Sequence, residues 1–453
     1  MNALLEKKDR ILFTILTLYF FIMVYGNLFK FSKIEASTGL STVLILLIIL
    51  LKFNVIFKEM LQKPVFKVIA LVFFWCMVTS LFSAEGVLRA YTRLIMLSGY
   101  LFAAVAVYRM YLPEERVRFL IYTLGVSIFI ASFLTIIDYL KIYNVPYVNE
   151  AGITTKIGGE RVEQAGGFFP RRSAMAAYYS IIIATLMYYA LKTKNIKVKM
   201  LLLVSSGISF IALFLTHNRS GILSVIMAMA IYLFMDKTVK MTKKIRIIIL
   251  SVIVFSILIV IIYFYLPGHI DVYIMKLNRY LPGGGFGAAV AITDSVVQSD
   301  ESRLYFFLSI MESLLTNPLG NGFSLVYTEK YGFKSPHNII SYLIWAMGIM
   351  AFILIPMLGY YIYRSLSLKK LLNKKNEDSE IVVCIVALQV GMLSWLINNM
   401  AHNSLSTGLA WLYLGIALNL LNRFKRENDP LNIGKIEKEV ADINLKRCLH
   451  LKN

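Results

Sequence analysis

Cysteine is scarce in this chain of 453 residues, with only Cys76, Cys384 and Cys448 spread over its length. Three isolated cysteines form neither a disulfide framework nor a cysteine-based metal site. Acidic residues are also few: the chain has 26 of them and 47 basic residues, which gives a formal net charge of +21. In a soluble protein this charge would indicate a nucleic-acid ligand. No window of the sequence resembles a separate soluble domain, so the charge requires another explanation.

Long apolar stretches dominate the sequence, and hydrophobic residues make up 58% of it. Most stretches approach the ~20 residues that an α-helix needs to cross the hydrocarbon core of a bilayer. Helices satisfy their own backbone hydrogen bonds in lipid. The sequence therefore predicts an all-α polytopic membrane protein, with residues 1–453 forming a single membrane domain of about twelve transmembrane helices. The predicted spans are residues 11–29, 39–57, 66–83, 91–110, 117–139, 173–191, 200–216, 220–235, 245–266, 338–362, 380–398 and 404–422.

The basic residues sort onto one side of the predicted membrane. With a cytoplasmic N-terminus, the inner segments hold 32 of the 47 lysines and arginines, and each segment holds at least three. This is the positive-inside bias, and it predicts that both termini are cytoplasmic. The basic residues then orient the protein in the membrane and attract anionic membrane lipids. No nucleic-acid partner is expected. The inner segments are 1–10, 52–67, 109–118, 192–199, 237–246, 364–375 and the tail 423–453.

Two external segments are longer than simple turns, residues 140–172 and residues 267–337. A 71-residue external loop that carries aromatic residues is expected to be functional rather than a linker. Apolar residues recur at helical spacing between residues 303 and 315. This pattern predicts a helix on the outer leaflet that ends at Asn317-Pro318. The predicted apolar face consists of Leu304, Phe307, Met311 and Leu314.

Histidines and arginines gather on the predicted outer side, where the arginines run against the positive-inside bias. An arginine at the mouth of a span often extends its charged end to lipid headgroups, and that explanation stays open for each of them. Arg93 lies inside the fourth span, where a charge is costly and often functional, and Asp138 is its expected partner. The outer residues of interest are His217, His337, His402, Arg161, Arg171, Arg172, Arg219 and Arg303.

An outer pocket with arginines and a histidine suits a lipid diphosphate headgroup. Arginine is permanently charged and binds two phosphate oxygens at once, so it offsets the charge that develops on a departing diphosphate. Histidine titrates near neutral pH and accepts a proton from a hydroxyl nucleophile. A metal is not required, because the outer acids Asp294, Asp300 and Glu301 form no clear ligand set. These residues together indicate transfer of a sugar from a lipid diphosphate to a hydroxyl.

Three stretches on the outer side carry these residues in a distinctive order. The first is Thr216-His217-Asn218-Arg219, where an arginine opens a span. The second runs from Ser302-Arg303-Leu304 to Asn317-Pro318-Leu319-Gly320-Asn321-Gly322. The third is Pro336-His337-Asn338, followed by Gly348-Ile349. Together, over roughly residues 90–422, they resemble the O-antigen ligase and O-antigen polymerase superfamily of bacterial membrane glycosyltransferases.

The resemblance implies an undecaprenyl-diphosphate-linked glycan as donor and metal-independent, inverting transfer without a cofactor. It implies that Arg219 and Arg303 bind the diphosphate and that His337 is the catalytic base; the competing explanation makes His337 only the first residue of a span. The acceptor would be a glycan, lipid A–core or another hydroxyl. The site would face the periplasm or cell exterior from the bacterial cytoplasmic (inner) membrane. Further candidate site residues are His217, Arg93, Arg161, Arg171, Arg172 and Asn338.

One segment departs from the family pattern. Gly166-Gly167-Phe168-Phe169-Pro170 faintly matches a family element, but Arg171-Arg172 stands where the family favours an Asn-containing turn. The alternative function is a twelve-span transporter or a lipid-linked oligosaccharide flippase, which carries charges along the bundle axis; here the spans hold few ionisable residues. A structural scaffold would leave the outer arginines unexplained. A ligase and a polymerase need the same donor site, so the sequence does not separate them.

Overall fold

The computed structural model describes fifteen stretches of the chain, and all structural statements below concern these residues. They are residues 2–25, 30–31, 34–83, 85–145, 152–157, 160–165, 167–169, 172–235, 242, 245, 294–328, 332–334, 338–367, 379–401 and 407–427. The predicted span 245–266 falls almost wholly outside them.

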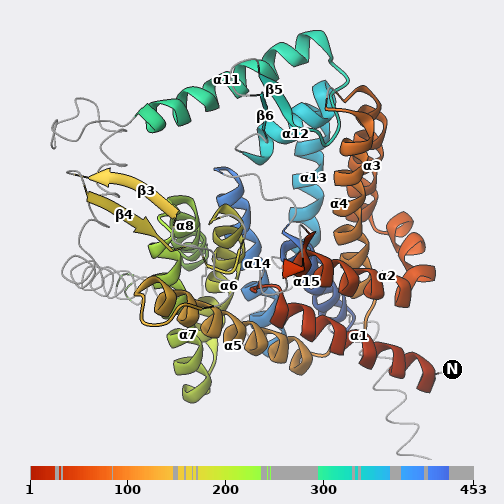
Figure 1. The fold of residues 1–453 in the computed structure, drawn as a ribbon. Coiled ribbons are helices and arrows are strands. Elements are labelled where there is room, and N and C mark those ends of the chain that lie inside the picture. The colour runs from red at the N-terminus through yellow and green to blue at the C-terminus, as the bar shows by residue number, and fades with distance from the viewer. Residues whose placement is uncertain are drawn as a thin grey trace, which may run out of the picture.

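Helices account for nearly all of the described chain, in agreement with the predicted all-α class (Figure 1). Local sequence sets several of their ends. Pro64 opens a helix at the first-turn position that tolerates its missing N–H, and the Asn195 side chain caps the amides of Lys197 and Val198. The helices are α1 (Asn2–Ile22), α2 (Ala36–Gln62), α3 (Pro64–Thr79), α4 (Val87–Tyr108), α5 (Glu114–Tyr139), α6 (Arg172–Lys192), α7 (Ile196–Leu215), α8 (Arg219–Met235), α11 (Asp294–Thr316), α12 (Ile339–Met347), α13 (Ala351–Leu366), α14 (Glu380–Asn399) and α15 (Gly408–Glu427), with short 3-10 turns η1 (Ser80–Phe82) and η2 (Gly348–Met350).

Three short antiparallel ribbons qualify the all-α prediction. They occupy the connections between helices, and two of them lie in the long segments predicted to be external. The ribbons are β1 (Lys30–Phe31) with β2 (Ile34–Glu35), β3 (Gly152–Ile157) with β4 (Glu160–Gln164), and β5 (Val326–Thr328) with β6 (Gly332–Lys334). None of these strands joins a larger sheet in the described part of the chain, so helix packing builds the fold.

Seven described helical segments are long and apolar enough to cross a membrane, which makes the fold that of a helical membrane protein. They correspond to the predicted spans that begin at residues 66, 91, 117, 173, 200, 338 and 380. Described helices cover parts of the predicted spans 11–29, 39–57, 220–235 and 404–422 without meeting that standard. Helix α1 begins with charged residues, and the apolar stretches of α2 and α8, Val43–Phe53 and Arg219–Phe234, are shorter. The total of twelve spans stays a prediction.

The predicted span 338–362 is not one continuous helix. It consists of the nine-residue α12 and the sixteen-residue α13, separated by the 3-10 turn at Gly348–Met350. Gly348 has φ +59°, a left-handed conformation that a right-handed helix excludes. Apolar composition alone carries no sign of this break, because both sides of it are hydrophobic.

Helices α6 and α14 pack against each other, and α5, α7, α8 and α15 pack around them. Helix α15 then joins this group to α4, which in turn contacts α2 and α3. Small residues allow the closest approaches: a Cβ on Gly415 of α15 would lie 2.3 Å from the carbonyl oxygen of Ala104 on α4. Such contacts drive helix association in lipid, where the hydrophobic effect between helices is absent.

Ion pairs join segments that the sequence analysis assigns to the same, inner side. Each pair links residues that are far apart in the chain but share the predicted cytoplasmic face, which supports the alternation of inner and outer segments. The pairs are Lys52 with Asp9 (2.6 Å), Arg109 with Glu59, and Arg423 with Glu114 (3.1 Å). The direction of insertion rests on the positive-inside rule.

Helix α11 lies across one end of the bundle, beyond α12 and the ends of α3 and α4 (Figure 1). It ends at Thr316, as the Asn317-Pro318 signal predicts, but it starts nine residues before residue 303. Phe306 and Ile310 are buried against Val326 and Trp345, and Met311 of the predicted apolar face packs against the same cluster. Phe307, another residue of that face, is 48% exposed, and its contact with the outer leaflet stays a prediction. The helix thus has apolar residues on two sides, one facing the protein and one facing outward.

We expect cysteines on the two predicted sides to differ in their reaction with an impermeant thiol reagent. Leu315→Cys on α11 should label from outside in intact cells, because residue 315 is 85% exposed. Ile196→Cys, at a residue 64% exposed at the start of α7, should label only after permeabilisation. The background is a Cys448→Ser protein, in which Cys76 and Cys384 are buried. The reverse pattern would overturn the orientation.

Candidate functional site

The corner between α7 and α8 presents Arg219, one of the two predicted diphosphate ligands. Helix α7 ends at Leu215, and the Thr216 hydroxyl donates to the carbonyl oxygen of Leu213 at 2.7 Å. The Asn218 side chain then accepts from the amide of Gly221 at 3.1 Å, which caps the start of α8. Arg219 is the first residue of that helix and is half-buried. The corner is thus a fixed turn that places the arginine at a helix N-terminus.

His217 occupies this corner in an unusual backbone conformation. Its φ of +53° lies in the left-handed region, which non-glycine residues seldom adopt. Its side chain is 5% exposed, so the imidazole lies inside the corner rather than on its surface. Strained residues persist where their surroundings fix them, and they concentrate at functional sites. His217 lies two positions before Arg219, which is compatible with a role in the candidate site. Its burial, however, restricts contact between the imidazole and an acceptor hydroxyl.

The segment at residues 165–169 is held against the same corner. The Ala165 amide donates to the carbonyl oxygen of Leu215 at 3.0 Å. Phe168 packs edge-on against Tyr25 at 5.5 Å between ring centroids, and Phe169 stacks on Tyr178 at 5.2 Å. This segment therefore anchors the connection before α6 to the bundle through buried aromatic rings.

The arginines around that segment occupy different elements. Arg161 lies on β4, opposite Lys156 of β3, and Arg172 is the first residue of α6. Their side chains, and Arg171 as a whole, lie outside the described residues. The structure therefore assigns Arg161 to a charged hairpin and Arg172 to a helix start.

A second region on the predicted outer side, called the second outer region below, forms where the turn after α11 meets the break between α12 and α13. Three backbone hydrogen bonds join them: Asn321 and Gly322 amides donate to the carbonyls of Trp345 and Ala346, both at 3.0 Å, and Ile349 donates to Pro318 at 2.9 Å. These bonds satisfy carbonyls that the end of α12 leaves free. The Asn317–Gly322 motif therefore fixes the end of α11, which carries Arg303, to the bundle.

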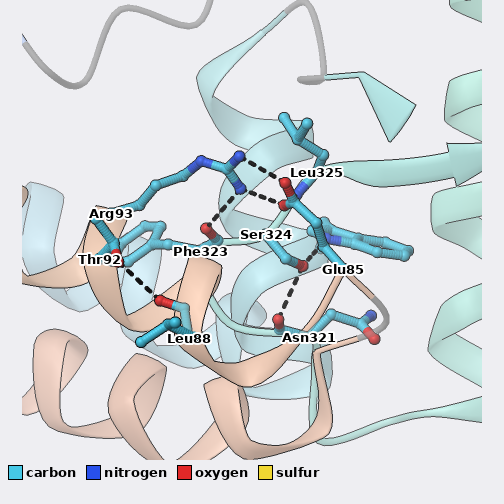
Figure 2. A network of polar contacts seen from close by, with 9 residues as sticks. Glu85, Leu88, Thr92, Arg93, Asn321, Phe323, Ser324 and Leu325 are labelled. Atoms are coloured by element: carbon cyan, nitrogen blue, oxygen red, sulfur yellow. Dashed lines mark hydrogen bonds and ion pairs between the residues drawn. The ribbon is translucent and has the colours of Figure 1, made fainter. Parts of the chain in front are cut away.

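Arg93 belongs to this second region, and its partner is Glu85 rather than the predicted Asp138. Its guanidinium forms two hydrogen bonds to the Glu85 carboxylate, one of them at 2.7 Å (Figure 2). Glu85 also accepts from the Leu325 amide at 2.7 Å. Asp138 instead accepts from the amide of Val145 at 2.9 Å. The sequence suggested no role for Glu85, although it is a carboxylate beside a span end eight residues before an intramembrane arginine.

This ion pair ties the chain after α11 to the α3–α4 corner. Arg93 also contacts the carbonyl oxygen of Phe323 at 3.4 Å (Figure 2). Ser324 accepts from the Trp345 indole at 3.0 Å. The Glu85 side chain is 3% exposed. The bonds from Arg93, and the one from the Leu325 amide, hold the pKa of Glu85 below its ordinary value although burial opposes this. The stability they provide is present above the ordinary carboxylate pKa and is lost as the pH falls through the lowered, folded-state value.

We expect Glu85→Gln to loosen residues 321–326. Glutamine keeps the shape but removes the charge that Arg93 binds, which should cost about 1–3 kcal/mol. Hydrogen–deuterium exchange of a peptide that contains Leu325 should accelerate. Arg89→Gln is the matched control, because Arg89 is exposed and close to Glu85 without a hydrogen bond to it in the described contacts. Equal protection in both variants would show that the pair does not hold this segment.

The remaining predicted residues are only partly described. Arg303 lies on α11, but its side chain is outside the described side chains, and His337 and His402 lie outside the described residues altogether. Asn338 is the N-cap of α12, and its side chain accepts from the Ser341 amide at 2.6 Å. This capping role explains why an asparagine stands at position 338, without a role in substrate binding. Figure 1 places α8 and α4, which carry Arg219 and Arg93, on opposite sides of the bundle.

Comparison of the chain with protein-family models finds no match, and comparison with curated proteins finds none either.

Proposed function

We propose that this protein is a membrane glycosyltransferase that moves a glycan from an undecaprenyl-diphosphate lipid to an acceptor hydroxyl. The transfer takes place on the outer face of the bacterial cytoplasmic membrane. The observation that carries the proposal is Arg219, which a buried polar corner holds at the first turn of α8. The same predicted outer side carries Arg303 on α11 and His337 immediately before α12. The resemblance to O-antigen ligases and polymerases supports the same assignment.

The proposed reaction needs an anion site and a base. Arg219 and Arg303 bind the diphosphate and offset the charge that grows on it as it leaves. His337 removes the proton of the acceptor hydroxyl. The acceptor oxygen then forms a bond to the anomeric carbon as the bond from that carbon to the diphosphate oxygen breaks. The products are the lengthened or ligated glycan, undecaprenyl diphosphate and a proton on the histidine.

The alternative is a transporter or a lipid-linked oligosaccharide flippase. Such proteins carry ionisable residues along the axis of the bundle, to line a path. The described ion pairs instead lie towards the two ends, with Glu85 and Arg93 on the predicted outer side and Asp9, Glu59 and Glu114 on the inner side. This distribution favours chemistry at one face over passage through the bundle.

The test uses purified full-length protein in detergent with an undecaprenyl-diphosphate-linked glycan and an acceptor. We expect a glycosidic product and free undecaprenyl diphosphate. Two acceptors are supplied in separate reactions: a single repeat unit linked to undecaprenyl diphosphate, and lipid A–core. Transfer to the first indicates a polymerase, and transfer to the second indicates a ligase. Movement of the lipid-linked glycan across a vesicle membrane without any new glycosidic bond would favour the flippase instead.

We expect Arg219→Ala and Arg303→Ala each to weaken transfer, because each removes a charge-assisted contact worth about 1.5–3 kcal/mol. Lysine should restore activity only in part, since a point charge does not bind two oxygens at once. The measurement is the rate of product formation at equal protein abundance. Arg364→Ala, which removes an arginine from the last turn of α13 on the predicted inner side, is the control and should keep full activity. Full activity in either test variant removes that arginine from the donor site.

A further inference from the structure

Three basic side chains gather at the predicted cytoplasmic end of α4. Lys63 Nζ lies 5.7 Å from the centre of the Tyr108 ring, and the guanidinium carbon of Arg109 lies 6.0 Å from it. Tyr108 is buried and packs edge-on against Phe66, so its ring is a fixed support for both cations. Lys425, in the last turn of α15, is the third, and it is close enough to Lys63 for the two charges to repel each other.

Three separate helix ends contribute these residues, and helix packing brings the ends together. Lys63 is the single residue between α2 and α3, and Arg109 directly follows α4. The buried side chain of Asn419 on α15 donates to carbonyl oxygens at the end of α4, with that of Tyr108 at 2.8 Å. This amide joins α15 to the end of α4. Lys425 follows on the same helix and is thereby placed near the α2–α3 corner.

The negative charge near this cluster does not balance the positive charge. Glu59 is completely buried and pairs with Arg109. Neither Lys63 nor Lys425 has an acidic partner within the part of the chain that the structure describes. Burial and the nearby charge of Lys63 lower the pKa of Lys425 from its ordinary value, as desolvation and a like charge do for a lysine. The two lysines therefore share a place where an anion would offset both charges.

The depth of the two lysines in the membrane favours a lipid as the source of this anion. Lys63 lies three residues before the predicted span 66–83, and Lys425 lies three residues after the predicted span 404–422. At 1.5 Å per helical residue, each lies about 4–5 Å beyond the end of its span, at the level of the headgroups. Basic pockets between helices on the cytoplasmic side bind anionic headgroups. A soluble phosphate compound would meet the same lysines but has no acyl chains to hold it at this depth.

We propose that Lys63 and Lys425 bind the phosphate of an anionic phospholipid from the cytoplasmic leaflet, beside Arg109. The bound phosphate links the α2–α3 corner to the end of α15 and offsets the repulsion between the lysines. The site lies on the opposite predicted side of the membrane from the proposed glycan transfer, and it does not depend on that function.

The experiment measures the affinity of phosphatidylglycerol for the purified full-length protein in detergent, by native mass spectrometry. Lys63→Gln/Lys425→Gln should bind the lipid about tenfold or more weakly, as expected for lost hydrogen bonds between charged groups. Phosphatidylglycerol should also raise the thermal stability of the wild type more than that of this double variant. Lys425→Gln alone changes an exposed side chain. Without lipid it should be at least as stable as the wild type, because it removes a like-charge repulsion, and it should still bind the lipid more weakly.

Lys194→Gln/Lys197→Gln is the matched control. Both lysines are exposed and lie in the predicted inner segment 192–199, so the net charge changes equally on the same side of the membrane. This control should bind phosphatidylglycerol as the wild type does. Equal weakening in both double variants would show that overall charge alone attracts the lipid. Unchanged binding by Lys63→Gln/Lys425→Gln would remove the two lysines from the site. If inorganic phosphate binds as tightly as phosphatidylglycerol and displaces it, the ligand is a soluble phosphate compound and the lipid assignment is wrong.

Discussion

Replacing His337 with alanine is expected to slow glycan transfer by about 10²-fold or more, the usual contribution of a positioned general base. Binding of the lipid diphosphate should change little, because the proposal assigns the anion to the arginines and the proton of the acceptor hydroxyl to His337. Activity of the wild-type protein should also fall as the pH drops through the pKa of the histidine, since only the neutral ring accepts a proton. This prediction separates the chemical step from donor binding.

The measurement combines transfer kinetics in detergent with a separate determination of donor affinity. His450→Ala, in the predicted cytoplasmic tail, is the control and should leave both unchanged. If His337→Ala abolishes donor binding but leaves the turnover of bound donor intact, His337 is a headgroup ligand. The base would then have to be His217 or His402. Because His217 is 5% exposed, His402 would be tested first.

Local signals in the sequence predicted much of the fold. Apolar length located the seven helices that can cross a membrane, and Asn317-Pro318 located the end of α11. Both are properties of adjacent residues, which a sequence displays directly. The grouping of basic residues predicted which segments meet, and the pairs of Lys52 with Asp9 and Arg423 with Glu114 agree with it.

Features that depend on distant partners were predicted less well. Helical spacing on α11 marks an apolar face at Phe307 and Met311, but it does not reveal that Phe306 and Ile310 are buried against β5 and α12. Arg93 was assigned Asp138, near the outer end of the next span, as its partner, although it pairs with Glu85, which the Leu325 amide also contacts. A helix with apolar residues on two sides gives no unique periodicity from which to choose.

In the candidate site, too, local features were predictable from the sequence and long-range contacts were not. The turn that presents Arg219 follows from residues 215–221 alone, where Asn218 caps α8. Asn398 contacts that turn from 178 positions away, and no spacing in the sequence connects the two. Sequence motifs therefore predict the turn itself but not the distant residue that it contacts.

Gly348→Ala is expected to give the largest loss of stability among substitutions in the second outer region. A Cβ at this position would lie 2.1 Å from the Pro318 carbonyl oxygen and 2.6 Å from the Gly320 amide nitrogen. Both are backbone atoms, so no change of rotamer relieves the overlap. The backbone of Gly348, with φ 59° and ψ −141°, is in a region that other residues rarely adopt, at a cost of about 1–3 kcal/mol, and overpacking adds about 1–3 kcal/mol. The expected loss is thus about 2–6 kcal/mol.

The same substitution should lower transfer activity, because the turn after α11 loses its attachment to the break between α12 and α13 while the arginines and histidines are unchanged. The measurement is thermal unfolding in detergent, with transfer followed at a temperature where both proteins remain folded. Gly359→Ala on α13 is the matched control: nothing lies within 4 Å of its added Cβ, and alanine favours a helix by about 0.8–1 kcal/mol over glycine. Equal stability of the two variants would contradict the close approach of Pro318 and Gly348. Reduced stability with full activity would show instead that transfer does not require the turn to be held at the break.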